Sequence, residues 1–375
     1  MKKIIIIIIV AIAGLVMWSN QTTIRQFLKP AQPVGVPGVT STANTTKKPE
    51  ADVVMVAKNL RIPWEIAFLP NGEMLVTERP GNLVKFGTEK TVITIEDTER
   101  IGEGGLQGMA LHPDFVQNNF IYLYRTTKNN GRLINQVIRY RLRDTVLDDK
   151  KIILDNIPAS KYHDGGRIAF GPDKKLYVTT GDAEQKTRAQ DTSYLGGKIL
   201  RMNDDGTTPT DNPFSNSLVY SYGHRNPQGI AWDGEGKLWA TEHGRSIPLS
   251  GYDELNHIGA GKNYGWPTIQ GNATQAGMET PVINSGADTT WAPAGLLYYA
   301  GHLFFTGLRG EALYEFDPDT KKITAHFFKE FGRLRAITLG PDGWFYVSTS
   351  NTDGRGVARD SDDQIIKINP IVFNQ

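Results

Sequence analysis

Short runs of aromatic and β-branched residues, each preceded by a tight turn, recur along the chain. In every copy an apolar residue is followed by a turn, mostly of the Pro-Asn/Asp-Gly kind, and then by a strand-like run. The six copies span residues 68–78, 111–125, 170–182, 231–244, 297–310 and 339–351, the fifth in a weaker form. This pattern predicts six β-hairpins.

The spacing of these hairpins predicts the architecture. Neighbouring copies lie about 40 to 70 residues apart, which matches a four-stranded blade with variable loops. Because one hairpin is too small to bury its own faces, the blades must pack against one another. We therefore predict an all-β fold: a six-bladed β-propeller of four-stranded antiparallel blades around a central channel, over residues 51–375. A β-sandwich with similar hairpins is the alternative, because such turns are common.

The N-terminal residues depart from this pattern. Lys2 and Lys3 precede fifteen uncharged, mostly apolar residues, 4–18. This run is shorter than the roughly 20 residues that comfortably span a bilayer, so residues 1–20 are expected to be a signal peptide or an N-terminal membrane anchor. Residues 21–50, rich in Pro, Thr, Ala, Gly and Lys, indicate a disordered linker. We expect an exported protein that is periplasmic, extracellular or tethered to the outer side of the cytoplasmic membrane.

Composition narrows the classes of partner. The 39 glycines, 20 prolines and 10% aromatic residues favour many short strands joined by turns. The net charge is +1 and no long block of like charge appears, so neither nucleic acid nor an anionic membrane surface is expected as a partner. The absence of cysteine excludes disulfides, thiolate metal sites and thiol nucleophiles.

Polar residues that flank the hairpins are the candidates for chemistry. His163 precedes Gly165 and Gly166, which permit a sharp loop that presents the imidazole. In a propeller the equivalent ends of all blades lie on one face, so residues far apart in sequence converge there. The residues expected at this mouth are His163, Asp182, Arg225, Asn226, Arg309, Arg333 and Arg335.

Cationic residues form the second group of candidates. Arg225 and Asn226 lie in a Pro- and Gly-containing loop, where they could bind a ligand or only tie down loop backbone. Arg333 and Arg335 are two residues apart, hence on one side of a strand or extended loop. Two adjacent guanidiniums repel unless an anion lies between them, so the pair predicts a carboxylate-bearing ligand or a buried acid. An exposed strand face is the alternative.

The segment 241–267 mixes acidic side chains with turns. Carboxylates and free loop carbonyls are ligands that Ca²⁺ prefers, whereas zinc spacing and EF-hand spacing are both missing. The segment therefore indicates a calcium site, with a packed turn at 264–266 as the alternative.

Five segments together resemble the soluble pyrroloquinoline quinone-dependent glucose and aldose sugar dehydrogenases. The similarity covers roughly residues 51–370. In chain order the segments are YHDGGRIAFGPD (162–173), GGKILRMNDDGTTPTDNPF (196–214), SYGHRNPQGIAW (221–232), DELNHIGAGKNYGWP (253–267) and FGRLRAITLGPDG (331–343). The resemblance implies a six-bladed propeller that binds pyrroloquinoline quinone (PQQ) beside Ca²⁺. It further implies oxidation of the C1 hydroxyl of aldoses to lactones, with electrons passed to an external acceptor.

The resemblance also implies roles for individual residues. His163 would be the general base, with Asp182 orienting its ring. Cofactor contacts would come from Glu103, Arg225, Asn226, Gly307, Leu308, Arg309, Arg333 and Arg335. Main-chain carbonyls at Gly244 and Arg245 would hold the calcium ion of the cofactor, and Glu254 and Tyr264 match a second, structural calcium position.

Three departures from the family pattern stand out. Glu103 occupies a position that is commonly glutamine, and a carboxylate there would repel an anionic cofactor unless it takes up a proton, pairs with an arginine or turns toward solvent. Arg309 occupies a position that is often lysine. A tyrosine that follows NYGWP in some members has no clear counterpart among residues 272–278.

Two other functions stay open at this point. A calcium-dependent lactonase of similar architecture would not need the arginine cluster, and a non-catalytic sugar-binding propeller would not need His163 and Asp182. We expect a sugar dehydrogenase that is a monomer or a homodimer.

Overall fold

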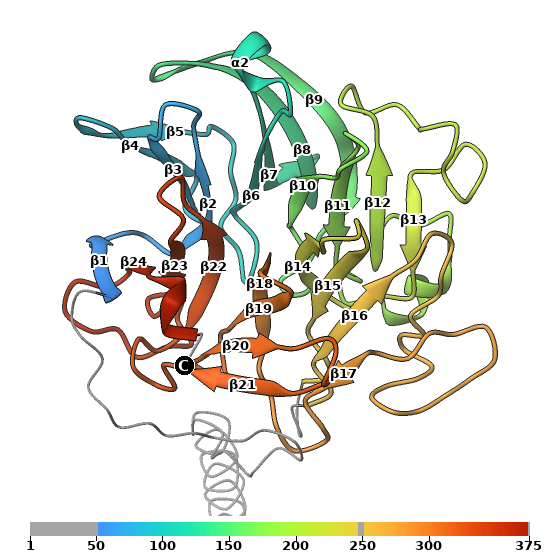
Figure 1. Cartoon of the computed structure of the whole chain (residues 1–375). Helices are drawn as coiled ribbons and strands as arrows, with labels where there is room; N and C mark the ends of the chain where they lie inside the picture. The colour runs from blue at the N-terminus through green and yellow to red at the C-terminus, as the bar shows by residue number, and fades with distance from the viewer. Residues whose placement is uncertain (1–51, 247–250, 374–375) are drawn as a thin grey trace, which may run out of the picture. The chain divides into compact units, whose positions relative to one another are not determined.

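Six four-stranded antiparallel sheets make up the computed structural model, which describes residues 52–246 and 251–373 (Figure 1). The predicted six-bladed all-β propeller is confirmed. Within blades 1 to 5 the strands pair in the order of the sequence. The expected signal or anchor and the linker, residues 1–50, lie outside the described residues.

Blades 1 to 3 follow one another along the chain. Blade 1 contains β2 (Pro63–Phe68), β3 (Met74–Glu78), β4 (Asn82–Phe86) and β5 (Lys90–Thr94). Blade 2 contains β6 (Leu106–Leu111), β7 (Phe120–Asn129), β8 (Arg132–Arg143) and β9 (Val146–Pro158). Blade 3 contains β10 (Ile168–Phe170), β11 (Leu176–Thr180), β12 (Lys198–Met202) and β13 (Val219–Tyr222). The helical turns α2 (Phe115–Asn118) and η2 (Lys186–Gln190) lie in connections of blades 2 and 3.

Blades 4 to 6 complete the ring. Blade 4 contains β14 (Pro227–Trp232), β15 (Leu238–Glu242), β16 (Glu254–Ile258) and β17 (Ile283–Asn284). Blade 5 contains β18 (Pro293–Tyr299), β19 (His302–Gly307), β20 (Leu313–Phe316) and β21 (Ile323–His326). Blade 6 contains β22 (Leu334–Leu339), β23 (Phe345–Thr349), β24 (Ile365–Ile368) and, from the start of the described chain, β1 (Val53–Ala57), with η3 (Pro370–Phe373) after it. Because β1 pairs with β24, strands from both ends of the described chain close the ring.

The six predicted hairpins coincide with the first two strands of the six blades. Each predicted segment covers the turn between these strands, as between β2 and β3 at 68–78 and between β22 and β23 at 339–351. This agreement has a local cause, because the turn residues and the alternation of the following strand are short-range signals.

The hydrophobic core is divided among the junctions between blades. Six clusters of buried side chains each join two neighbouring blades. Between blades 1 and 2, for example, Leu75 and Leu83 share a cluster with Leu106 and Ile121. Burial of both faces of the inner strands explains why β3, β11 and β15 are buried along their whole length.

Threonine hydroxyls connect successive blades near the innermost strands. The Thr77 hydroxyl accepts a hydrogen bond from the Glu65 N–H (3.0 Å) and donates one to the carbonyl of Gln107 in the next blade (2.5 Å). The same donation to the following blade runs from Thr241 to Ala294 (3.0 Å) and from Thr306 to Arg335 (2.6 Å). The hydroxyls of Thr77 and Thr306 each satisfy buried main-chain groups on two blades at once.

Polar side chains from the innermost strands meet in the middle of the ring. Arg167, just before β10, donates to the carboxylate of Glu65 on β2 and, through Nε, to the carbonyl of Gln228 (2.8 Å). Arg335 on β22 donates to Oε1 of Gln228 on β14 (3.2 Å). The blades are therefore cross-linked by buried polar contacts at the end of the strands that carries the candidate site.

Candidate active site

His163 lies on the loop that leads into β10, in a left-handed backbone conformation with φ of 64°. Its main chain is held on both sides, because its N–H donates to Glu103 Oε2 (3.0 Å) and its carbonyl accepts from the Ala183 N–H (3.1 Å). Only glycine fits opposite it, since a Cβ on Gly181 would lie 1.8 Å from the His163 carbonyl oxygen. These contacts fix the loop that carries the imidazole.

The structure brings His163 and Asp182 together, as the sequence predicts. His163 Nδ1 lies 2.8 Å from Asp182 Oδ1, and the carboxylate is fully buried. Burial would raise the pKa of Asp182, but hydrogen bonds from His163 and Trp266 outweigh it, so the pKa is lowered. An ionised Asp182 can only accept, so Nδ1 of His163 carries a hydrogen, and in the neutral form of the ring the lone pair lies on Nε2. The imidazole is thus arranged to take up a proton at Nε2.

Glu103 lies beside His163 and has an arginine partner. Its Oε1 accepts from Arg355 Nη1 (2.8 Å), and its Oε2 accepts from the His163 N–H (3.0 Å) and from Asn226 Nδ2 (3.4 Å). Burial opposes ionisation, but Arg355, His243 and His163 together lower the pKa of Glu103. Of the three expected accommodations, the structure shows pairing with an arginine, Arg355. The lowered pKa favours the ionised carboxylate over one that has taken up a proton.

Arg225 and Asn226 lie next to the dyad. The Arg225 guanidinium is 5.4 Å from the centre of the Trp266 ring and donates to the His243 carbonyl (3.3 Å). Burial lowers the pKa of Arg225. Asn226 is fully buried, and its Oδ1 accepts from the Gly165 N–H (2.9 Å). Asn226 therefore ties down the His163 loop, while Arg225 is a buried cation without a carboxylate bonded to its guanidinium in the described chain.

Arg333 and Arg335 are both buried but have different partners. Arg333 Nη2 lies 2.8 Å from Oδ2 of buried Asp353, which is the acid that the sequence left open as one explanation of the pair. Arg335 donates to neutral groups, Ser350 Oγ (3.4 Å) and Gln228 Oε1 (3.2 Å). Burial, reinforced by the neighbouring Arg79, lowers the pKa of Arg335 to about 9. Arg335 thus carries the less compensated charge.

The loop 307–309 lies beside Arg333. Arg333 Nη1 donates to the Leu308 carbonyl (3.0 Å), and the Gly307 N–H donates to the Ala312 carbonyl (2.9 Å). Arg309 is exposed; partial burial lowers its pKa, with Asp253 acting in the opposite direction. The structure therefore brings this loop to the arginine pair, as expected.

Gly244 and Arg245 lie next to Asp253. The Gly244 N–H donates to Asp253 Oδ1 (2.8 Å), and the Arg245 carbonyl accepts from the Gly251 N–H (3.3 Å). The Arg245 guanidinium lies 4.7 Å from the ring centre of Tyr252. In residues 52–246 and 251–373, no group of three or more His, Asp or Glu side chains is arranged to hold a metal ion. Calcium at this loop therefore stays a prediction.

Glu254 faces a second carboxylate inside blade 4. Glu254 on β16 lies directly opposite Glu242 on β15 in the strand register. Burial together with the Glu242 charge raises the pKa of Glu254 to about 8. Within the described chain, Asn256 Oδ1 nearby is buried without a hydrogen-bond partner. Two facing carboxylates and an unsatisfied amide oxygen suit a cation.

Tyr264 is the other residue expected at the second calcium position. Its side chain packs inside the protein. Its hydroxyl donates to the His257 carbonyl (2.6 Å), and its ring stacks on His224 at 4.7 Å. The packed-turn alternative therefore describes this side chain correctly, and its hydroxyl is committed to main chain.

Sequence reasoning missed four residues of the site: His243, Trp266, Asp353 and Arg355. Trp266 Nε1 donates to Asp182 Oδ2 (2.8 Å). Burial lowers the pKa of His243 to about 4, so its ring is neutral. His243 comes directly after the strand of a predicted hairpin, so the rule that selected Asp182 would have found it. Asp353 follows the last predicted hairpin, 339–351, by two residues. Trp266 and Arg355 carry no such positional signal.

The residues present fit an anionic, quinone-type cofactor. Arg225 Nε and His243 Nε2 are buried and have no hydrogen-bond partner in the ranges that the structure describes. Together with Arg335, they offer polar groups that the protein itself does not satisfy. A ligand that carries carboxylates would provide the missing acceptors and charge.

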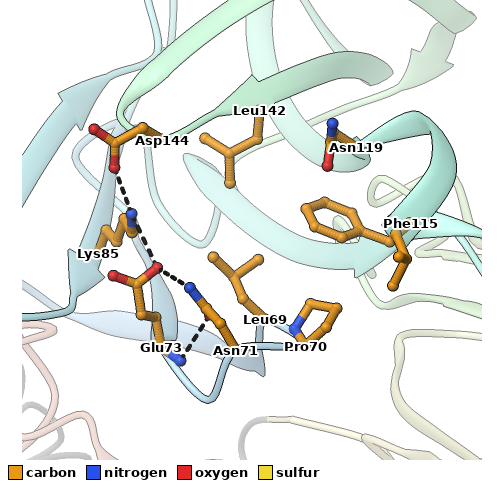
Figure 2. A pocket seen from close by; sticks show the side chains of 10 residues that line it. Leu69, Pro70, Asn71, Glu73, Lys85, Phe115, Asn119, Leu142 and Asp144 are labelled. Atoms are coloured by element: carbon orange, nitrogen blue, oxygen red, sulfur yellow. Dashed lines mark hydrogen bonds and ion pairs between the residues drawn. The ribbon is translucent and has the colours of Figure 1, made fainter.

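A separate cavity of about 480 Å³ lies at the opposite ends of the strands, between blades 1 and 2 (Figure 2). Lys85 bridges Glu73 (3.0 Å) and Asp144 (2.8 Å) on its rim, over an apolar floor that includes Leu69 and Leu142. None of the candidate residues lines it. This cavity is therefore not part of the candidate active site.

Comparisons with known proteins identify the family. The chain matches the family model described as Glucose / Sorbosone dehydrogenase over residues 60–359. It is 31% identical to aldose sugar dehydrogenase YliI of Escherichia coli (strain K12), over 85% of this chain and 93% of that protein. It is 34% identical to quinoprotein glucose dehydrogenase B of Acinetobacter calcoaceticus, over 64% of this chain and 58% of that protein.

A solved structure agrees with this assignment. The PQQ-bound form of aldose sugar dehydrogenase from Streptomyces coelicolor is 38% identical and superposes with a TM-score of 0.78, covering 84% of this chain and 97% of that chain. The chain belongs to the glucose/sorbosone dehydrogenase family.

Proposed function

We propose that this chain is a PQQ-dependent aldose sugar dehydrogenase that oxidises the C1 hydroxyl of its substrate to a lactone. The observation that carries the proposal is the His163–Asp182 dyad, whose Nδ1 to Oδ1 distance is 2.8 Å, beside buried and poorly compensated arginines. A base can remove the hydroxyl proton of the substrate while the neighbouring arginines bind an anionic cofactor beside it.

Arg225, Asn226, Arg333 and Arg335, with the loop 307–309, would hold the quinone, and Glu103 would lie beside it as a carboxylate neutralised by Arg355. The incomplete hydrogen bonding of Arg225 and the neutral partners of Arg335 support this assignment. When bound, the quinone supplies the acceptor for the hydride that leaves C1. The protein contributes orientation and charge compensation.

His163 would act as the general base of the reaction. Asp182 holds the Nδ1 hydrogen, so the lone pair on Nε2 can take the proton of the C1 hydroxyl. The carboxylate then stabilises the imidazolium that forms, because the pKa of Asp182 is lowered by its hydrogen bonds and it stays ionised. Proton removal and loss of the hydride together convert the C1 carbon into the carbonyl carbon of the lactone.

Calcium would occupy two positions. Main-chain carbonyls at Gly244 and Arg245 would hold an ion beside the quinone, and Glu254 with the main chain of Tyr264 would hold a structural ion. The raised pKa of Glu254, about 8, supports the second position, because burial and the neighbouring Glu242 charge oppose its ionisation and a bound cation would relieve both.

Dye-linked oxidation of aldoses by the purified protein tests the proposal. We expect turnover only when both PQQ and Ca²⁺ are supplied to protein that has been treated with a chelator. Turnover that needs Ca²⁺ but not PQQ, or hydrolysis of a lactone without any dye reduction, would contradict it. The same assay with a series of aldoses defines the preferred sugar, and alternative dyes probe the external electron acceptor.

Export is a separate part of the proposal. No helix in residues 52–246 and 251–373 is long and apolar enough to cross a membrane, and the proposed signal or anchor, residues 1–20, precedes them. N-terminal sequencing of the protein recovered from fractionated cells would distinguish a cleaved signal from a retained anchor. Sedimentation of the purified protein would distinguish a monomer from a homodimer.

A further inference from the structure

We infer that Glu103 and Arg355 form a neutral clasp, in which Arg355 is a positioning residue that lets an ionised Glu103 hold the His163 loop beside an anionic cofactor. This inference rests on the proposed function for its effect on quinone binding. Its effect on the His163 loop is independent of any ligand. The two effects are therefore measured separately.

The Glu103 carboxylate is satisfied by the protein itself. One oxygen accepts from Arg355 Nη1 at 2.8 Å, and the other accepts from the His163 N–H at 3.0 Å and from Asn226 Nδ2 at 3.4 Å. These three donors come from the connections that precede β10 and β14 and follow β23. A single carboxylate thus joins blades 3, 4 and 6 around the site.

The backbone around Glu103 keeps the carboxylate in place. The Glu103 N–H donates to the Lys161 carbonyl at 2.9 Å. Gly102 has φ of 59°, and a Cβ there would lie 1.8 Å from the same carbonyl oxygen. Only glycine allows this close approach of the two loops. Glu103 is therefore fixed against the His163 loop and does not turn toward solvent: its side chain is 15% exposed.

Arg355 is itself positioned by Asp353, the ion-pair partner of Arg333. Asp353 Oδ1 accepts from the Arg355 N–H at 2.9 Å, and Asp353 Oδ2 accepts from Arg333 Nη2 at 2.8 Å. The Arg355 guanidinium lies 5.5 Å from the ring centre of Tyr162. A continuous set of hydrogen bonds thus runs from Arg333 through Asp353 and Arg355 to Glu103 and the loop of the base.

The charge balance explains why this chain can carry a carboxylate at position 103. An unpaired Glu103 would repel the carboxylates of a quinone and would be costly to bury. Arg355 cancels that charge, and it does so within a network of fixed donors, unlike an isolated surface ion pair. Exposure of the Arg355 side chain is 49%, so its removal is expected to leave the fold intact.

A double-mutant cycle with Arg355→Met and Glu103→Gln tests the clasp through quinone binding. In the protein that keeps Glu103, loss of Arg355 is expected to raise the quinone Kd by about tenfold or more, because it exposes an uncompensated carboxylate to an anion. In the Glu103→Gln variant the same loss is expected to change Kd by less than about threefold. Arg355→Lys should restore most of the affinity. Equal effects of Arg355→Met with and without Glu103→Gln would overturn the inference.

Hydrogen exchange of the His163 amide in the protein without quinone provides the second readout. We expect faster exchange in Glu103→Ala and Arg355→Met, and near wild-type exchange in Glu103→Gln, which keeps an acceptor. Arg359→Met is the matched control, because Arg359 lies in the same connection but bonds to the carbonyls of Lys329 and Glu330. Exchange that is equal in all variants would overturn the clasp. If the wild-type protein binds no quinone, the proposed function fails, while the exchange rates still decide on the clasp.

Discussion

The indole N–H of Trp266 lies 2.8 Å from Oδ2 of Asp182, the residue whose other carboxylate oxygen accepts from the catalytic candidate His163. The same indole ring carries the Arg225 guanidinium 5.4 Å from its centre. One aromatic side chain therefore contacts both the base dyad and a cation proposed to hold the cofactor. It fixes their relative positions in a buried environment.

Trp266→Phe removes only the indole donor and the second ring. Because the Trp266 hydrogen bond helps to lower the pKa of Asp182, its loss should raise that pKa. Activity needs ionised Asp182, so the acidic limb of the kcat profile should move to higher pH. We expect kcat to fall by about tenfold, the effect of one charge-assisted hydrogen bond.

Trp239→Phe is the control for this prediction. Trp239 Nε1 also donates to an aspartate, Asp233 Oδ2 (2.8 Å), but at the turn between β14 and β15, away from the candidate site. Its replacement should leave kcat and the pH profile unchanged. An unchanged profile in Trp266→Phe would mean that Trp266 has only a packing role.

His163→Gln should remove the proposed base without removing the cofactor site. We expect kcat to fall by roughly 10²-fold or more, while the quinone Kd measured by titration stays near the wild-type value. The reason is that His163 contributes only its main-chain N–H to the clasp, and glutamine keeps that group. Wild-type turnover in quinone-loaded His163→Gln would exclude the assignment.

The two neighbouring arginines should differ in their effect on stability. Arg333→Met leaves the buried Asp353 carboxylate without its ion pair, so we expect the free energy of unfolding to drop by about 3 kcal/mol. Arg335→Met removes a desolvated cation with neutral partners, so the protein without quinone should be as stable as the wild type or more stable. Urea denaturation checks both values.

Quinone titration completes the comparison of the arginines. Arg335→Met should weaken binding by about 1.5 to 3 kcal/mol, because a charge-assisted contact is lost. If Arg335→Met binds quinone normally and is less stable, Arg335 is a structural residue.

The pKa of Glu254 makes stability depend on pH in the absence of calcium. Its folded-state pKa of about 8 is above the ordinary value of 4.5. Between these values the folded state binds more protons than the unfolded state, so this group makes the free energy of unfolding decrease as pH rises. Below about pH 4.5 this loss of stability is absent.

Bound calcium, or a neutral side chain at position 254, should each suppress this pH dependence of stability. Denaturation in a chelator should show the decrease in the wild type and a smaller one in Glu254→Gln, and Ca²⁺ should restore stability at high pH only in the wild type. Stability that does not respond to Ca²⁺ in the wild type would exclude Glu254 as a calcium ligand.

The repeating part of the fold was predictable because its signals are local. A Pro-Asp-Gly turn and an alternating strand are contained within about a dozen residues, and six copies leave few architectures. His163 and Asp182 were found for the same reason, since one hairpin separates them. The charge of Glu103 could be recognised as a problem from the sequence alone.

The partners of these residues were not predictable, because each comes from a distant part of the chain. Arg355 bonds to Glu103 across 252 positions of sequence, and Trp266 bonds to Asp182 across 84. Such pairs form only when the ring brings loops of different blades together. The order of residues in the sequence does not indicate the direction in which a loop side chain points in the closed ring.

Pairing of β1 with β24 has a consequence for biosynthesis. Val53 lies opposite Ile368, so the first described strand cannot be completed as part of a sheet until the last strand has left the ribosome. Blades 1 to 5 can assemble in the order of translation, whereas β1, with Val54, Met55 and Val56 partly exposed even in the finished ring, waits as a free apolar edge. Ring closure is therefore a late event, and nascent chains that stop before β24 should be the species that need a chaperone.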